Sequence, residues 1–137
     1  MKPDFVYDRV KGIMYVLVTR PSGSIYTPIG NGYSGRAEGK NNPRWEKAAG
    51  KGPIPEGFWV VGQAYTSRRV GPIAIPLRPS VSTLTYGRSA FLIHGDSKLH
   101  PGQASAGCII LPAQTRARIA RHVDALLHVS DERPNLI

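Results

Sequence analysis

The stretch that decides the fold is Ser89-Ala-Phe-Leu-Ile-His-Gly-Asp-Ser97, which is followed by Ser105-Ala-Gly-Cys-Ile-Ile-Leu111. Each part contains a short apolar run of the kind that forms a buried strand. We therefore expect one strand that ends at His94 and another that begins at Cys108, the only cysteine of the chain. Neighbouring ends of these two strands would bring an imidazole and a thiol together.

The segments around this pair also favour short strands. A helical period appears once, over residues 112–123, where Pro112 suits a first turn and Ile119 and Val123 recur four positions apart. Apolar runs bounded by turn residues predict the remaining strands, which cover residues 5–8, 13–19, 58–61, 72–78 and 125–129. The predicted fold class is mainly β, with one short helix after the cysteine strand.

Turn residues and prolines give further expectations about this architecture. Lys11-Gly12 joins the first two strands into a hairpin, and residues 21–24 form a second turn. The prolines within residues 72–78 predict an edge strand, because proline cannot donate to a ladder. Residues 30–57 are rich in glycine and proline, which predicts a long loop, and loops of that length are often functional.

The composition is that of a globular chain with a basic surface. Of 137 residues, 41% are hydrophobic and 20% are charged, and the net charge is +9. One domain over residues 1–137 suits this length. A basic surface favours nucleic acid, anionic lipid or acidic cell-wall polymer as a partner, or else serves solubility. No zinc-finger spacing, helix-turn-helix pattern or aromatic RNA motif is present, so we do not expect a nucleic-acid partner.

Neither membrane insertion nor ordinary export is expected. No apolar run approaches the ~20 residues that a membrane-spanning helix needs. The first residues, Met-Lys-Pro-Asp-Phe-Val-Tyr-Asp8, lack the apolar stretch of a signal peptide. We therefore expect synthesis in the cytoplasm without a signal peptide. The single cysteine cannot form an internal disulfide, and it does not identify the compartment.

The pair of His94 and Cys108 suits nucleophilic catalysis. A free thiol has a pKa of ~8.5, so little thiolate is present at neutral pH. A neighbouring imidazole corrects this by accepting the proton and later returning it to a leaving amine. Gly107 would leave room for a substrate and let backbone N–H groups face a developing oxyanion. Ser105 and Ala106 keep the turn small.

Other interpretations of the same residues stay open. A lone cysteine beside an apolar strand is often a small core residue, and a lone histidine is often a buried structural one. His94, Asp96, His100 and Cys108 are also permitted zinc ligands, but they include no tight pair such as Cys-x-x-Cys. We expect neither a metal nor a cofactor.

The chain order of the pair distinguishes between classes of cysteine enzyme. Papain-like peptidases place the cysteine before the histidine, whereas here His94 comes first. This order resembles the L,D-transpeptidase family, in which a strand ends in His-Gly and a later Ser/Thr-His-Gly-Cys precedes an apolar strand. Residues 105–108 fit the second motif, and Pro53-Ile-Pro-Glu-Gly-Phe-Trp59 is similar to the family's Pro-x-Gly-aromatic strand. The resemblance implies a β-sandwich or barrel.

The resemblance is closer to one branch of that family, the L,D-transpeptidase-like effectors of type VI secretion. Six motifs in one order carry it, and the resemblance covers nearly the whole chain. They are Gly32-Tyr-Ser-Gly35, Glu38-Gly-Lys-Asn-Asn-Pro43, Gly52-Pro-Ile-Pro55, Tyr86-Gly-Arg-Ser89, Phe91-Leu-Ile-His-Gly-Asp-Ser97 and Ala104-Ser-Ala-Gly-Cys-Ile-Ile-Leu-Pro112.

The resemblance implies roles for the central residues. Cys108 is the nucleophile, His94 is the general base, and the N–H groups of Gly107 and Cys108 form the oxyanion hole. One position departs from the broad family, because Ala106 stands where a second histidine is usual.

This departure leaves open what fixes the tautomer of His94. Asp96, Ser105 and a backbone carbonyl are the alternatives. Asp96 is equally well explained as a turn residue after the strand.

Substrate-binding roles are assigned around the same motifs. Arg88 is expected to hold a substrate carboxylate, because a guanidinium matches that group bidentately, although a solvent-facing role stays open. Lys40 and Asn42 would line the cleft or else shape their loop. The full set of expected substrate-binding residues is Arg88, Gly95, Ser97, Tyr33, Lys40 and Asn42.

The resemblance implies an antibacterial toxin that modifies peptidoglycan stem peptides in the periplasm of target bacteria. It would act as an L,D-carboxypeptidase, an L,D-transpeptidase, or both. A cognate immunity protein and a secretion-system component or adaptor are the implied protein partners. A different hypothesis is a non-catalytic module that binds cell wall or another polyanion through its basic surface, and for that module the thiol would be dispensable.

Overall fold

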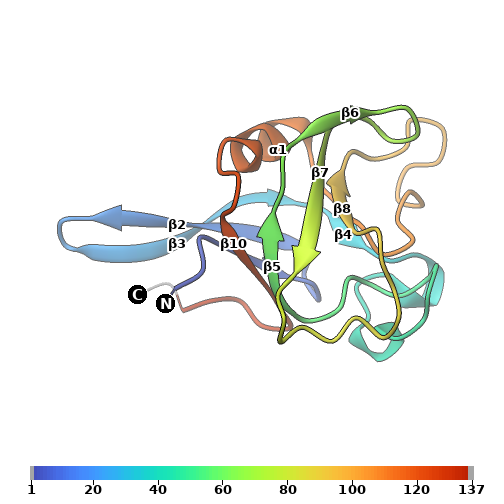
Figure 1. Cartoon of the computed structure of the whole chain (residues 1–137), viewed down its shortest axis with the longest axis horizontal. Helices are drawn as coiled ribbons and strands as arrows, with labels where there is room; N and C mark the ends of the chain where they lie inside the picture. Colours follow the sequence, from blue (N-terminus) through green and yellow to red (C-terminus); the bar gives the residue numbers. More distant parts are fainter. Residues whose placement is uncertain (1, 136–137) are drawn as a thin grey trace.

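The computed structural model describes residues 2–135 and confirms a mainly β chain with one α-helix (Figure 1). The strands are β1 (Phe5–Asp8), β2 (Ile13–Arg20), β3 (Gly23–Asn31), β4 (Tyr33–Ser34), β5 (Gly57–Val61), β6 (Tyr65–Ser67), β7 (Gly71–Pro79), β8 (Leu92–His94), β9 (Ile109–Ile110) and β10 (Leu126–Ser130). The helices are the 3₁₀ turns η1 (Ala37–Gly39) and η2 (Pro43–Trp45) and the α-helix α1 (Ala113–Ala120).

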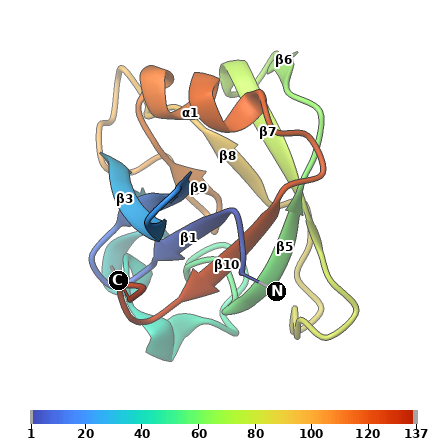
Figure 2. The same ribbon diagram turned by 90° about the vertical axis from the view of Figure 1, so that its left-hand side faces the viewer.

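The strands pair into one mixed sheet in the order β3-β2-β1-β10-β5-β7-β8-β9-β4, and β6 adds to β7. Two pairs are parallel, β1 with β10 and β8 with β9, whereas the other pairs are antiparallel. Figure 2 shows β1, β10 and β5 side by side, with α1 across one end and β8 and β9 behind them. The parallel pairs join segments that are far apart in the chain.

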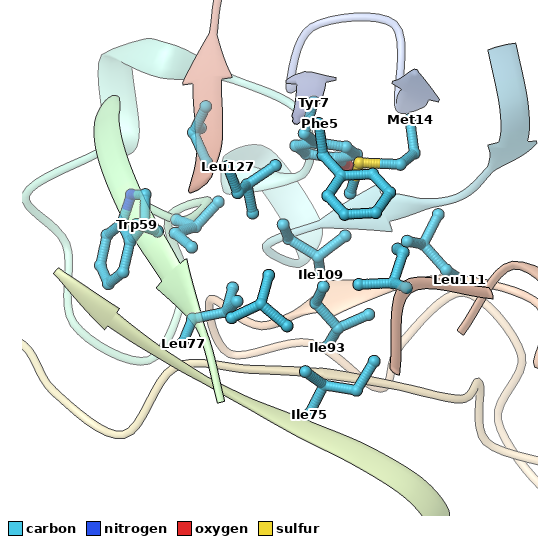
Figure 3. Close-up of a cluster of buried hydrophobic side chains, with 14 of the residues drawn as sticks. Phe5, Tyr7, Met14, Trp59, Ile75, Leu77, Ile93, Ile109, Leu111 and Leu127 are labelled. Atoms are coloured by element: carbon cyan, nitrogen blue, oxygen red, sulfur yellow. The ribbon is translucent and has the colours of Figure 1, made fainter. Parts of the chain in front are cut away.

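The sheet curves around one main hydrophobic core. Successive side chains of a strand point to opposite faces, so Phe5 and Tyr7 of β1 enter this core whereas Val6 does not. Ile93 and Ile109, from the strands behind, are fully buried against the same cluster. Figure 3 shows these isoleucines directed toward Phe5 from the opposite side of the core.

Residues 23–31 correct one expectation, because they form strand β3 where only a turn at residues 21–24 was predicted. Pro28 and Gly30 weaken the strand pattern of this segment. Both residues are tolerated because β3 lies at one end of the strand order. The expected hairpin of β1 and β2 and its turn at Gly12 are confirmed.

The expected long loop at residues 30–57 is also only partly correct. This segment contains the end of β3, the two-residue strand β4, and the 3₁₀ turns η1 and η2. β4 pairs with β9, so the segment crosses the molecule to reach the strand after Cys108. Its elements are too short to show a period in the sequence.

The prediction that residues 72–78 form an edge strand is wrong. β7 lies between β5 and β8, but it pairs with β5 only over Leu77–Pro79 and with β8 only over Ile75–Pro76. Leu77, not Pro76, donates its N–H to the carbonyl of Phe91. Because the ladders of β7 with β5 and with β8 are short, its prolines lie at positions where the sheet needs no backbone N–H donor.

The strand before His94 and the helix after Leu111 are shorter than expected. β8 begins at Leu92 rather than Ser89, and the preceding Ala90 has a left-handed backbone with φ 63°. Pro112 is the N-cap of α1, which ends at Ala120, so Val123 lies outside the helix and is exposed. Within residues 2–135, no helix is long and apolar enough to cross a membrane.

Candidate active site

Strands β8 and β9 bring His94 and Cys108 to one face of the sheet. In their parallel register Ile93 lies beside Ile109, and His94 lies beside Ile110. The two isoleucines at positions 93 and 109 enter the core, so the alternation of a strand directs His94 and Cys108 to the opposite face. Both line one cleft of about 400 Å³. The two residues that the sequence pairs therefore line the same cleft.

The imidazole of His94 is held in one tautomer by its own neighbour. Its side chain is 2% exposed, and Nδ1 lies 2.8 Å from the carbonyl oxygen of Gly95. A carbonyl can only accept, so Nδ1 carries the proton and Nε2 is left with its lone pair. Burial lowers the pKa of His94, the bond to Gly95 opposes this, and Arg69 and Arg116 lower it further. The imidazole is therefore neutral at pH 7.

The thiol of Cys108 is partly exposed to the cleft. Its Sγ accepts a hydrogen bond from the N–H of Leu92 at 3.4 Å. Burial raises the pKa of the thiol above its ordinary value, whereas that hydrogen bond, Arg69 and Arg88 oppose the rise. Cys108 and His94 are thus both neutral at rest, and the thiol has to lose its proton during any reaction.

The turn that carries Cys108 is fixed by the buried hydroxyl of Ser105. Its Oγ accepts from the N–H of Gly35 at 2.8 Å and from that of Gly107 at 3.1 Å, and it donates to the carbonyl of Cys108 at 2.6 Å. Ser105 therefore orients the backbone of the turn, and its hydroxyl makes no hydrogen bond to His94 among residues 2–135. The N–H of Gly107, expected in an oxyanion hole, is already bonded within the turn.

A second buried hydroxyl supports this turn from β4. Ser34 Oγ donates to the carbonyl of Gly107 at 3.0 Å and accepts from the N–H of Ile54 at 2.9 Å. The N–H of Ser34 in turn donates to Asn41 Oδ1 at 3.1 Å. Sequence motifs that lie far from Cys108 in the chain therefore converge on its turn.

Arg88 holds the other side of the same turn. It is 8% exposed, and its two terminal nitrogens donate to four carbonyls at 2.5–3.2 Å, those of Glu46, Gly52, Pro53 and Ala106. These bonds use four of its five N–H groups. A substrate carboxylate would have to displace them to bind Arg88 bidentately, so the side chain serves here as a structural tie.

The same arginine explains why position 107 is glycine. Gly107 has φ 142°, and a Cβ there would lie 2.4 Å from Nη2 of Arg88 and 3.1 Å from the ring of Phe91. The space that glycine leaves is therefore filled by the protein itself. It does not provide the room for a substrate that the sequence suggested.

Asp96 is engaged away from His94. Its carboxylate accepts from the hydroxyl of Tyr33 at 2.7 Å, from the N–H of Ser97 at 2.8 Å and from the N–H of Gly102 at 3.2 Å. Tyr33 also accepts from the N–H of Ala104 at 2.8 Å, and burial and Asp96 raise the pKa of Tyr33 to about 12. Asp96 and Tyr33 thus fasten residues 95–104, and the carbonyl of Gly95 orients the imidazole.

The other expected substrate-binding residues lie around this loop. Gly95 and Ser97 line a second hollow of about 450 Å³, which shares the walls formed by His94, Arg69 and Ala104 with the cleft of Cys108. The Nζ of Lys40 lies 4.3 Å from the ring centre of Tyr33. Asn42 caps η2 by accepting from the N–H of Arg44. Tyr33, Lys40 and Asn42 line neither hollow.

Arg69 is a site residue that the sequence reasoning missed. It lies in the turn between β6 and β7, and it lines both hollows beside His94. An exposed arginine in a turn of a chain with 18 basic residues carries no signal of its own. The zinc alternative gains no support, because residues 2–135 contain no group of three His, Cys, Asp or Glu side chains that could hold a metal ion.

Comparison with known proteins gives one match. The family model of the Tlde1 domain matches residues 29–131, which is most of the chain and includes every residue of the cleft. The chain therefore belongs to the Tlde1 domain family, a toxin family of type VI secretion effectors. No match was found among curated proteins or among solved structures. The family implies a secreted antibacterial effector with a cognate immunity protein.

Proposed function

We propose that this member of the effector family is a cysteine acyl-transfer enzyme that acts on the stem peptides of peptidoglycan. Its substrate is a tetrapeptide stem, from which it removes the terminal D-alanine. The observation that carries the proposal is the shared cleft of Cys108 and His94, in which the Nδ1 bond to Gly95 leaves Nε2 free as a base. Peptidoglycan as the substrate rests on the resemblance to L,D-transpeptidases.

The first half of the reaction forms an acyl-enzyme. Nε2 of His94 takes the thiol proton as Sγ of Cys108 attacks the carbonyl carbon of the diaminopimelate residue. The C–S bond forms and the carbonyl π pair moves onto oxygen. When the C–N bond breaks, the imidazolium returns its proton to the departing nitrogen, and free D-alanine and a thioester remain. The neutral pair described above supplies both the proton and its acceptor.

The N–H of Cys108 is the oxyanion donor in this proposal. The N–H of Gly107 donates to Ser105 Oγ in the resting enzyme, so it stabilises the oxyanion only if that bond is exchanged. A preorganised donor is worth most when it faces the charge that develops in the transition state. The bonds that Ser105 and Ser34 make to this turn hold the Cys108 N–H in place.

The second half of the reaction decides the product. His94 deprotonates a water molecule, which attacks the thioester carbonyl, and the thiolate leaves with the proton as a thiol again. The product is then a tripeptide stem, which is the L,D-carboxypeptidase outcome. An amine that replaces water gives a cross-link or an exchanged D-amino acid, which is the L,D-transpeptidase outcome. Both outcomes share the acyl-enzyme and need no cofactor.

The proposed place of action is the periplasm of a target bacterium, where stem peptides are accessible. A secretion-system component or adaptor would carry the chain there, and the immunity protein would protect the producing cell. The net charge of +9 suits attraction to acidic cell-wall polymers, since a basic surface concentrates near polyanions.

Purified tetrapeptide muropeptides and mass spectrometry test this function. We expect the wild type to release D-alanine, whereas Cys108→Ala and His94→Gln release none. His128→Gln is the matched control, because His128 lies in β10 and lines neither hollow beside His94. Unchanged muropeptides at high wild-type concentration would refute the activity. Equal cell-wall binding by wild type and Cys108→Ala, without release, would instead support a binding module.

A further inference from the structure

The backbone of Arg69 is held in a turn, whereas its side chain is exposed and unpaired within residues 2–135. The hydroxyl of Ser67 accepts from the backbone N–H of Arg69 at 3.2 Å and from that of Val70 at 3.1 Å, which fixes the turn between β6 and β7. The residue is exposed, and it forms a wall of the cleft of Cys108 and of the hollow beyond His94. In Figure 1 this turn lies beside the loop that follows β8.

The other cations around the cleft of Cys108 are occupied, whereas Lys98 lines only the hollow beyond His94. Arg88 donates to four backbone carbonyls. Arg116 is 7% exposed and donates to the carbonyls of Leu111, Pro72 and Ile73. The ammonium of Lys40 lies over the ring of Tyr33.

By contrast, the Arg69 guanidinium makes no hydrogen bond or ion pair with any other residue in the range 2–135. Of the two arginines that line the cleft of Cys108, Arg69 is therefore the one that is free to take a ligand. Its positive charge acts on both members of the pair, because it lowers the pKa of His94 and opposes the rise in the pKa of Cys108.

We propose that Arg69 binds the carboxylate of the residue that leaves, and so selects stems with a free C-terminus. This inference rests on the proposed function. His94 must reach the departing nitrogen to protonate it, and the carboxylate of that residue is separated from the nitrogen by one carbon atom. A guanidinium can bind a carboxylate bidentately. Arg69 lines the same cleft as His94, so it is placed to bind this anion.

The residue whose carbonyl is attacked carries a carboxylate of its own, on its side chain. That group belongs to the acyl half, which stays on Cys108 after the terminal residue has left. Because Arg69 lines the hollows on both sides of His94, the experiment has to separate the two carboxylates.

The test compares three tetrapeptide stems: one with both carboxylates free, one with a terminal carboxamide, and one with a side-chain carboxamide. A charge-assisted bond to a carboxylate corresponds to about a ten- to hundredfold change in affinity. We expect the wild type to prefer the free terminus by about that factor in kcat/KM. Arg69→Gln should abolish the preference by losing activity only on stems with a free terminus, and Arg69→Lys should keep part of it.

Arg68→Gln is the matched control, because Arg68 is an exposed neighbour that lines neither hollow. It should retain the full preference for a free terminus. Three results would overturn the inference: an unchanged preference in Arg69→Gln, an equal loss on all three stems, or a loss of preference only for the free side-chain carboxylate.

The same measurements separate this inference from the proposed function. If the wild type releases no terminal residue from any stem, then the acyl-transfer activity fails, and the leaving residue that Arg69 would bind does not exist. If the wild type cleaves the terminal carboxamide as fast as the free acid, then the activity stands and the role of Arg69 alone is refuted.

Discussion

The half of the molecule built on β1, β10 and β5 and the turn around Cys108 are held by different forces. In the first, large apolar side chains such as Phe5, Trp59 and Leu127 are buried and pack on one another. In the second, the hydroxyl of Ser105 and the guanidinium of Arg88 are buried and bond to the backbone.

The difference follows from what each half has to do. Hydrophobic burial is strong but non-directional, so it holds strands together without aiming any one atom. Hydrogen bonds restrict both distance and angle. A thiol that must meet an imidazole and a carbonyl needs that restriction. The Cys108 turn obtains it from three buried polar side chains, those of Ser34, Arg88 and Ser105.

Arg88→Met should give the largest effect and should change both stability and activity. The substitution keeps an apolar stem but removes the donors to four carbonyls. Each buried carbonyl that loses its partner costs about 1–3 kcal/mol unless water reaches it. We expect the free energy of unfolding to fall by about 3–5 kcal/mol. Urea denaturation measures this fall, and muropeptide cleavage below the unfolding transition measures activity.

Leu127→Ala is the counterpart of this variant in the apolar half. Removing a buried leucine side chain costs about 2–5 kcal/mol, so the two variants lose similar stability. The leucine variant should keep the wild-type kcat/KM while folded, because it leaves the bonds around Cys108 intact. Equal losses of activity in the two folded variants would show that the polar ties have no special role in the site.

The apolar half is also the part that its sequence predicts best. Runs such as Phe5-Val-Tyr-Asp8 and Ala125-Leu-Leu-His-Val129 show strand patterns, and both fall within a residue of the observed strands. The prediction fails where local chemistry does not determine pairing. Prolines exclude an interior position only for a strand that is paired on both sides along its whole length. β7 instead changes partners along its length, so its prolines do not indicate an edge.

The sequence predicts the two central residues of the site but not the residues that surround them. His94 and Cys108 stand out because they lie at the ends of apolar runs, and the cleft contains both. The bonds of Ser34 and Arg88 cannot be read from spacing, because each joins segments that only the fold brings together. Arg69 is the extreme case, since its position beside His94 depends entirely on where the β6–β7 turn lies.

Ser105→Ala should have an intermediate effect. It leaves the N–H groups of Gly35 and Gly107 without their acceptor, and both glycines are buried. We expect a loss of about 1–3 kcal/mol in the free energy of unfolding and a lower kcat, because the backbone of Cys108 is no longer held. Thermal denaturation and single-turnover cleavage of muropeptides measure the two quantities.

The control for this variant is Ser24→Ala, in the β2–β3 hairpin, where the hydroxyl meets Thr19 in an exposed pair. Its stability should change by no more than about 0.5 kcal/mol. A higher kcat in Ser105→Ala would contradict the prediction. It would mean that the released N–H of Gly107 joins the oxyanion hole and that the serine restrains it in the wild type.

The pH dependence should give the smallest effect, because it changes a protonation state and breaks no contact. The acid limb of kcat/KM reports the free enzyme's base, here His94. Burial lowers the pKa of His94, and the charges of Arg69 and Arg116 lower it further. A lower pKa keeps the imidazole neutral in more acidic solution, so the midpoint of the limb should lie below the ordinary histidine value of ~6.5.

Arg69→Gln sharpens this prediction. Removal of one of the two cations should move the acid midpoint upward, toward the ordinary value. The measurement should use the terminal carboxamide stem, on which Arg69 has no leaving carboxylate to bind, so that only its effect on His94 is recorded. A wild-type midpoint above ~6.5 would mean that the imidazolium is stabilised. That outcome would indicate a thiolate–imidazolium pair at rest, in place of the neutral pair that the burial of both residues favours.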